Sequence, residues 1–131
     1  MKPRYYVAIA AYCTLIFWLS HQSSPVPIPM RFPGEDKIAH MVLYGGLAAL
    51  IAIGLHRAPR SHPAWVLRFG PVLFAGLYGL SDEIHQAFVP LRTASMLDLV
   101  ADIAGAALAS AACARYFRRR PVRTTACADE T

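Results

Sequence analysis

The stretch IAHMVLYGGLAALIAIGL, residues 38–55, decides the fold class, because none of its 18 residues is a carboxylate, a lysine or an arginine. A transmembrane α-helix needs about 20 mostly apolar residues to cross the hydrocarbon core of a bilayer. Three further apolar segments approach this length. The first covers residues 5–19, another starts between positions 64 and 71, and the last covers residues 96–114. The pattern predicts an all-α membrane protein with four transmembrane helices.

The composition of the whole chain agrees with this class. Only 16% of its 131 residues are charged, and its mean hydropathy of +0.37 is too high for a soluble domain of this length. The first apolar run is not followed by a convincing cleavage site, which favours a retained helix over a signal peptide. We predict one membrane domain over residues 1–120 and a disordered cytoplasmic tail over residues 121–131.

The third apolar segment fits two registers. Gly70-Pro71 is typical of a helix start with proline in the first turn, and about 20 residues counted from Pro71 end at Pro90. This register places residues 82–86 below the membrane surface, and we favour it. The alternative is a helix that begins at Ala64, in which Arg68 extends to the inner surface and residues 82–86 lie at the interface.

Lysines and arginines are divided unequally between the two ends of the predicted helices. If both termini are cytoplasmic, ten of these residues lie inside and three outside, as the positive-inside rule requires. The inner ten are Lys2, Arg4, Arg57, Arg60, Arg68, Arg115, Arg118, Arg119, Arg120 and Arg123, and the outer three are Arg31, Lys37 and Arg92. The five arginines between positions 115 and 123 directly follow an apolar segment, which indicates contact with anionic lipid headgroups. No motif supports nucleic-acid binding.

Polar residues concentrate in three segments that this topology brings to the outer side. They are residues 36–40, residues 81–92 (SDEIHQAFVPLR) and the pair Asp98 and Asp102. Asp98 and Asp102 are four residues apart, so both project from one helix face, which Gly105 and Ala109 continue with small residues. Polar groups beside hydrocarbon are costly and usually face a protein interior or a wet cavity. We therefore predict a polar cavity that faces outward.

Several of these residues also have structural interpretations. Asp36 can cap the second helix, and Ser95-Met96-Leu97-Asp98 reads as a variant of the capping box. Asp102 is predicted deep enough to need a partner, for which Arg92 or a histidine is suited. A polar network that only holds the helices together stays an alternative for the whole set.

The chemistry that such residues can perform is proton transfer or anion binding. A histidine beside a carboxylate is the usual arrangement for proton transfer, and Lys37 with Arg92 can hold a phosphate or carboxylate. Asp82, His85, Asp98 and Asp102 could supply metal ligands, but they lack a known ligand spacing, so we assign no metal and no cofactor. An ion pathway is disfavoured, since the inner halves of the second and fourth helices are almost wholly apolar.

Three motifs, taken in order along the chain, resemble the VanZ-like family. They are Asp36-Lys37-x-x-His40, then Ser81-Asp82-Glu83-x-His85-Gln86-x-Phe88-x-Pro90-x-Arg92, and last Ser95-x-x-Asp98-x-x-x-Asp102-x-x-Gly105. The resemblance covers roughly residues 19–109. It implies a small integral protein of the bacterial inner membrane with about four helices, and the family's namesake is associated with low-level teicoplanin resistance. Leu91 stands where glycine is frequent in the family, and Asp102 stands where asparagine is common.

We combine these observations into one functional hypothesis, in which the outward polar cavity binds or acts on a cell-envelope component. The expected partners are membrane lipids and a lipid-linked cell-wall precursor or another envelope anion. A non-catalytic membrane scaffold or partner-binding protein stays the alternative, and the residues leave open whether a reaction is catalysed. The catalytic candidates are His40, Glu83 and His85, the substrate-binding candidates are Lys37, Asp82, Gln86 and Arg92, and the supporting candidates are Asp36, Ser81, Ser95, Asp98 and Asp102.

Overall fold

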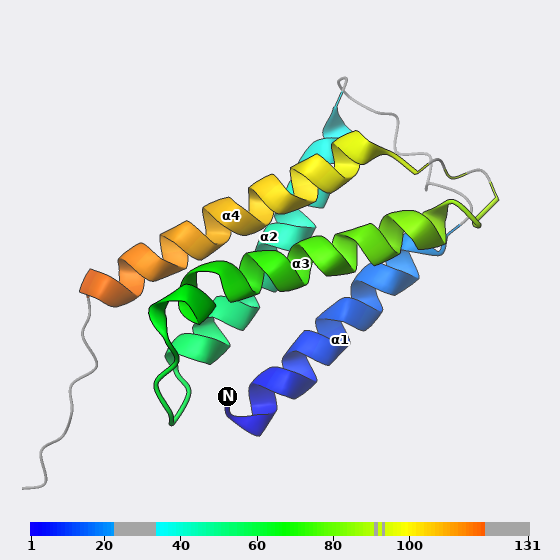
Figure 1. Cartoon of the computed structure of the whole chain (residues 1–131). Helices are drawn as coiled ribbons and strands as arrows, with labels where there is room; N and C mark the ends of the chain where they lie inside the picture. The colour runs from blue at the N-terminus through cyan, green and yellow to red at the C-terminus, as the bar shows by residue number, and fades with distance from the viewer. Residues whose placement is uncertain (23–33, 91, 93, 120–131) are drawn as a thin grey trace, which may run out of the picture.

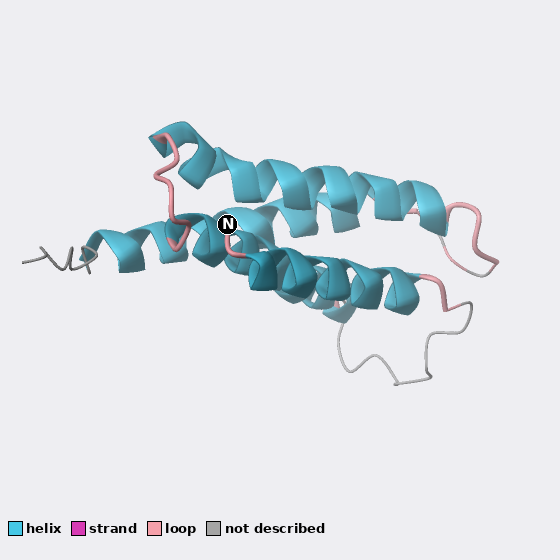
Figure 2. Ribbon diagram, turned by 90° about the horizontal axis from the view of Figure 1, so that it is seen from below, coloured by secondary structure: helices cyan, strands magenta, loops and turns pink. Residues whose placement is uncertain are grey.

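A computed structural model describes residues 1–22, 34–90, 92 and 94–119 of the chain. These residues form four α-helices, α1 (Pro3–Ser20), α2 (Glu35–His56), α3 (Ala64–Gln86) and α4 (Met96–Arg119), and no strand occurs among them. The helices run up, down, up and down along the chain, so the start of α1 and the end of α4 lie at the same end of the bundle (Figures 1 and 2). The predicted all-α class is confirmed.

Three of the four helices have the length and hydropathy of a membrane span. These are α2, α3 and α4, with mean hydropathies of 2.0, 1.2 and 1.6. Helix α1 is not among them, and its first turn contains Pro3, Arg4 and Tyr5, which lower its hydropathy. Large apolar side chains such as Leu73 and Leu77 are exposed on the outside of the bundle, as expected of a surface that faces lipid.

Helix α3 begins earlier than we predicted, so the favoured register was wrong. Pro63 has an extended backbone and occupies the N-cap position, and the helix starts at Ala64. Pro71 lies inside the helix and is buried, although its missing N–H leaves the carbonyl of Leu67 without its intrahelical donor. Such prolines are tolerated in membrane helices where neighbouring groups pack around them. Helix α3 ends at Gln86, which places residues 82–86 in its last turn.

Helices α2 and α4 approach each other through glycine. A Cβ atom on Gly105 would collide with the backbone carbonyl of Met41, and one on Gly45 would lie 3.2 Å from the carbonyl oxygen of Gly105. The predicted small-residue face of α4 is therefore confirmed. Beside this contact the core is built from Tyr44, Leu47, Ala48 and Ile51 of α2, Ala75 of α3, Ala106 of α4 and Ile16 of α1.

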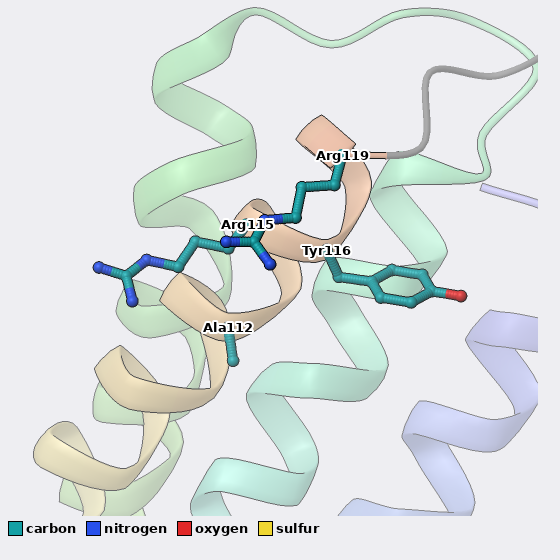
Figure 3. A pocket seen from close by; sticks show the side chains of 4 residues that line it. All are labelled: Ala112, Arg115, Tyr116 and Arg119. Atoms are coloured by element: carbon teal, nitrogen blue, oxygen red, sulfur yellow. The ribbon is translucent and has the colours of Figure 1, made fainter.

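Helix α4 extends past Ala114, where we predicted its end, so Arg115, Arg118 and Arg119 lie on its last turns. Figure 3 shows Arg115, Tyr116 and Arg119 around a shallow hollow of about 460 Å³ on this surface. The hollow lies at the opposite end of α4 from Asp98 and Asp102. The proline-rich part of the loop before α2, Leu91 and the predicted tail fall outside the described residues.

Candidate functional site

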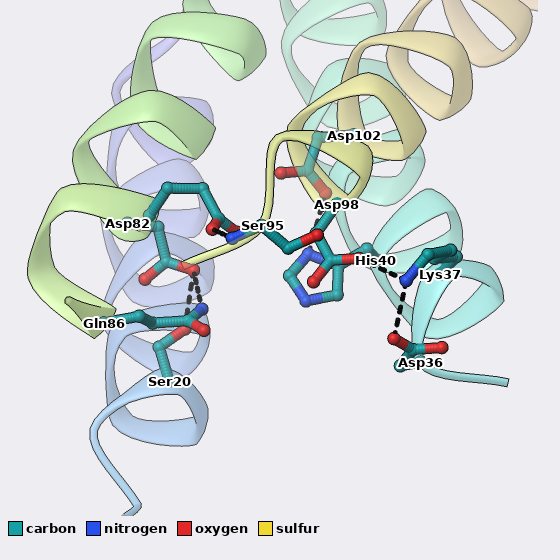
Figure 4. Close-up of polar contacts among 10 residues, drawn as sticks. Ser20, Asp36, Lys37, His40, Asp82, Gln86, Ser95, Asp98 and Asp102 are labelled. Carbon is teal, nitrogen blue, oxygen red and sulfur yellow. Dashed lines mark hydrogen bonds and ion pairs between the residues drawn. The ribbon is translucent and has the colours of Figure 1, made fainter. Parts of the chain in front are cut away.

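Most of the predicted site residues lie at the end of the bundle where α1 and α3 finish and α2 and α4 begin (Figure 4). They form two groups, one held together by contacts around His40 and one gathered at the end of α1. The His40 cluster consists of Asp36, Lys37, His40, Glu83, Ser95, Asp98 and Asp102. The Arg92 cluster consists of Ser20, His21, Asp82, His85, Gln86 and Arg92.

Lys37 joins α2 to α4 in the His40 cluster. Its Nζ atom donates to Asp36 Oδ2 at 2.8 Å and to Asp98 Oδ1 at 2.9 Å. The Asp98 side chain is 12% exposed, whereas that of Asp36 is 44% exposed, so only the pair with Asp98 is shielded from water. Gly34, with a φ of 93°, is the N-cap residue of α2, so Asp36 does not cap that helix.

His40 and Asp102 form the deepest polar pair of the same cluster. His40 Nδ1 lies 3.0 Å from Asp102 Oδ1, and Asp102 is fully buried. An ionised carboxylate can only accept hydrogen bonds, so His40 donates from Nδ1, and in neutral His40 the Nε2 atom is an acceptor. Of the two partners that we predicted for Asp102, the histidine is confirmed and Arg92 is wrong.

Glu83 connects α3 to the start of α4. Its Oε2 atom accepts a hydrogen bond of 2.6 Å from the backbone N–H of Ser95. In a capping box, a carboxylate in the first turn of the same helix accepts this hydrogen bond. Here Asp98, the residue in that position, binds Lys37, and Glu83 of α3 accepts the hydrogen bond from Ser95. Glu83 is 5% exposed, and its Oε1 atom has no hydrogen-bond partner among the described residues.

Arg92 lies against the end of α1. Its Nε and Nη2 atoms donate to the carbonyl oxygens of Gln22 and Leu19, both at 3.2 Å. The last carbonyls of a helix lack intrahelical donors and carry partial negative charge, so an arginine is a suitable partner for them. Arg92 therefore fixes the C-terminus of α1 to the segment that follows α3.

His85 and Asp82 also turn toward α1. His85 Nε2 lies 3.2 Å from His21 Nδ1, and its ring packs against Phe17 with 4.8 Å between the ring centroids. Asp82 is buried, and its Oδ2 atom accepts from Ser20 Oγ at 2.7 Å and from Gln86 Nε2 at 3.0 Å.

Two predictions about the site are changed by this arrangement. His85 belongs to the Arg92 cluster, and among the described residues no hydrogen bond joins it to His40 or Glu83, our other catalytic candidates. Ser81 is exposed and donates to the carbonyl of Tyr78 in its own helix, and among the described residues no side-chain hydrogen bond joins it to either cluster.

Two residues of the Arg92 cluster carried no functional prediction. Ser20 and His21 directly follow the first apolar run, residues 5–19, and were not among the site candidates. An up-and-down topology brings the end of the first helix beside the end of the third. This was the signal that could have placed Ser20 and His21 beside residues 82–86.

The two clusters differ in what they can do chemically. The His40 cluster offers an imidazole held by Asp102 and, close to it, the buried carboxylates of Glu83 and Asp98, which suits proton transfer or ligation of a cation. The Arg92 cluster offers a guanidinium and two imidazoles at its outer edge, which suits an anion.

Comparison with known proteins identifies a family for this chain. The family described as VanZ/LLP1 matches over residues 5–118, a range that includes all four helices except the ends of α1 and α4. No curated protein and no solved structure matches the chain.

Proposed function

The chain belongs to the VanZ/LLP1 family, and on that premise we propose that it is a membrane protein whose outer polar end binds an anionic group of a cell-envelope component. We propose that this anionic group is the phosphate of a lipid-linked cell-wall precursor. Three helices with the length and hydropathy of membrane spans support a membrane location. We assign α1 as the fourth span.

The proposed orientation places both termini in the cytoplasm and the two polar clusters outside. The described lysines and arginines support it, because eight of them lie at the end of the bundle where α1 begins and α4 ends, and two at the other. The eight are Lys2, Arg4, Arg57, Arg60, Arg68, Arg115, Arg118 and Arg119, and the two are Lys37 and Arg92.

Cysteine labelling tests this orientation. In a variant whose three native cysteines are replaced by alanine, a membrane-impermeant maleimide applied to intact cells should label Ala94→Cys, because this exposed position lies at the polar end. It should label Ser61→Cys, exposed between α2 and α3, only after the cells are permeabilised. The reverse pattern would overturn the orientation.

The environment of Arg92 is the observation that carries the proposed binding function. Two of the five N–H groups of its guanidinium bind the carbonyls of Leu19 and Gln22. The other three have no partner, and no carboxylate forms an ion pair with Arg92, within the part of the chain that the structure describes. A guanidinium that is fixed in position and not neutralised is suited to bidentate contact with a phosphate.

The histidines of the same cluster can complete this anion site. His21 lies in the chain between the two carbonyl acceptors of Arg92, and its ring stacks on that of His85 at a centroid distance of 5.4 Å. In the neutral pair one imidazole donates to the other, and the imidazole that accepts this bond keeps its own N–H for an anion. Lys37, our other predicted anion ligand, is bound by two carboxylates, so we now assign anion binding to Arg92 without it.

Replacement of Arg92 by glutamine tests the function. Glutamine removes the charge but retains an N–H donor for the end of α1, so we expect the protein to fold and to copurify with less lipid-linked precursor. Arg57→Gln, at the opposite end, is the matched control. If the site serves glycopeptide resistance, teicoplanin sensitivity should change with Arg92→Gln and not with Arg57→Gln.

A membrane scaffold is the second candidate function, and the hydrogen bonds between helices favour it. Ser20 and Asp82 join α1 to α3, Lys37 and Asp98 join α2 to α4, and Glu83 joins α3 to the start of α4. Such bonds hold membrane helices together without any ligand. This candidate predicts that the purified protein carries no envelope lipid and that Arg92→Gln differs from the wild type only in stability.

A further inference from the structure

We propose that His40, Glu83 and Asp98 form a binding site for a divalent transition-metal ion, Zn²⁺ or Mn²⁺. Each side chain offers one ligand atom, and these atoms lie within 4.8 Å of one another. Bonds of about 2.0–2.2 Å place ligand atoms roughly 3–4 Å apart, so small rotations at the side-chain ends suffice. The inference goes beyond the anion site and does not depend on it.

Glu83 supplies the first independent observation that a ligand belongs here. Its carboxylate is 95% buried, since 5% of the residue is exposed, and it comes from a different helix than the other two side chains. Oε2 is occupied by the backbone N–H of Ser95, but Oε1 has no partner among the described residues. A buried carboxylate oxygen without a partner is costly, and a bound cation would satisfy it.

His40 has the geometry of a metal ligand supported by a second carboxylate. Its Nδ1 atom is occupied by Asp102 Oδ1 at 3.0 Å, which leaves Nε2 for a ligand. Ligating histidines in proteins usually donate their other N–H to a carboxylate or carbonyl, which fixes the tautomer and orients the ring. Asp102 is the positioning residue in this arrangement, since it acts through His40.

The charges of the cluster also favour a divalent cation. Glu83, Asp98 and Asp102 are three buried carboxylates, and Lys37 is the one lysine or arginine that forms an ion pair with them in the described part of the chain. With His40 neutral, these three carboxylates and Lys37 together hold two negative charges in excess, which a divalent ion neutralises. Lys37 binds Asp98 Oδ1, so the second oxygen of Asp98 is left to the ion.

The donor set indicates which ions to test. One imidazole nitrogen and two carboxylate oxygens are compatible with Zn²⁺ and Mn²⁺, whereas Mg²⁺ prefers all-oxygen sites with several waters. The sequence analysis assigned no metal, and the ligands that it considered shared only Asp98 with this set. His40 and Glu83 lie on different helices and 43 positions apart, so their proximity follows from the packing of α2 against α3.

The test is metal binding by the full chain, purified in detergent without a polyhistidine tag and stripped with EDTA. Titrated with ZnCl₂ and MnCl₂, the wild-type chain should bind a single ion with at least one of the two. Glu83→Gln and Asp98→Asn should each weaken this binding by about tenfold or more, as loss of a metal contact does. MgCl₂ should not compete at equal concentration.

Asp82→Asn is the matched control, because Asp82 precedes Glu83 on α3, is equally buried at 5% exposed, and accepts hydrogen bonds from Ser20 and Gln86. It should bind the ion as the wild type does. Equal binding by Glu83→Gln and Asp82→Asn, or no stoichiometric binding by the wild type, would overturn the site.

A measurement on the Mn²⁺ complex covers the case in which the ligand variants fail to fold. Pulsed electron paramagnetic resonance should detect an imidazole nitrogen bonded to the ion in the wild-type chain. The same signal should persist in His85→Gln, which alters the histidine pair at the Arg92 cluster. If the ion binds without nitrogen coupling, or if the coupling is lost in His85→Gln, the assignment to His40 is wrong. If Zn²⁺ alone binds, nitrogen ligation is read from the X-ray absorption spectrum of the Zn²⁺ complex.

Discussion

Asp102 shows how one buried residue organises its surroundings. It is fully buried between α2 and α3, where its Oδ1 atom binds His40 and its Oδ2 atom faces Gly79. A Cβ atom added to Gly79 would lie 2.8 Å from Oδ2, so the glycine makes room for the carboxylate. The acceptor at Oδ1 fixes the tautomer of His40, on which both the proton chemistry and the ligand geometry depend.

Replacements of Asp102 separate the need for an acceptor from the need for a charge. Asp102→Asn keeps an oxygen that can accept from His40 Nδ1, so it should cost less than about 1 kcal/mol of stability. Asp102→Ala leaves that N–H unpaired in a buried position and should cost about 1–3 kcal/mol. The measurement is thermal unfolding of both variants in the same detergent.

Equal destabilisation by the two variants would contradict this interpretation. It would mean that the negative charge of Asp102 is needed, as in an ion pair with a protonated His40. The test is best made after EDTA treatment, so that a bound ion does not add its own stabilisation to the wild-type chain.

At the residue scale, sequence reasoning predicted which candidate residues gather at one end of the bundle better than it predicted how they are grouped there. Eleven of the twelve site candidates belong to one of the two clusters, and only Ser81 does not. Their division could not be predicted, because neighbours on a helix point about 100° apart. Asp82 and Glu83 are adjacent, yet one binds Ser20 of α1 and the other binds the start of α4.

At the scale of elements, the contact between α2 and α4 positions the His40 cluster. Lys37 and His40 lie in the first turns of α2, and their partners Asp98 and Asp102 lie in the first turns of α4. Gly45 and Gly105 hold the two backbones together about one turn deeper. Close backbone approach through small residues is a general way in which membrane helices associate.

Gly105→Ala should destabilise the protein strongly, because the new Cβ atom would meet the backbone of Met41 and not a side chain that can rotate away. Overpacking of this kind costs about 1–3 kcal/mol, and more where backbone must move. Gly70→Ala is the control, since its Cβ atom would meet only side-chain atoms at 3.7 and 3.9 Å. Unfolding of both variants in detergent measures the difference.

A Gly105→Ala variant as stable as the control would contradict the close approach of α2 and α4. This contact was predictable from the spacing of Asp98, Asp102, Gly105 and Ala109 on one helix face. The start of α3 was not predictable in this way. Gly70-Pro71 has the local pattern of a helix start, but the helix begins at Ala64, directly after Pro63. A local pattern does not reveal which of two prolines begins the helix.

At the scale of the whole molecule, the bundle has two chemically different ends. One end carries most of the described lysines and arginines, including Arg115 and Arg119 around the hollow of Figure 3. The other end carries the buried carboxylates, among them Asp98 and Asp102 of Figure 4. The histidine pair and Arg92 lie at this end as well. The basic end suits the cytoplasmic lipid surface, and the polar end suits an envelope ligand.

The measurement that tests the proposed function most directly is the amount of lipid-linked cell-wall precursor that copurifies with the protein. Wild-type, Arg92→Gln, Arg92→Lys and Arg57→Gln chains are purified in the same detergent, and the extracted lipid is quantified by mass spectrometry per mole of protein. We predict that wild type and Arg57→Gln carry the precursor, that Arg92→Lys retains part of it, and that Arg92→Gln loses roughly tenfold, as expected for a charge-assisted contact. A stable Arg92→Gln chain that carries as much precursor as the wild type, or a wild-type chain that carries none, would contradict the proposed function.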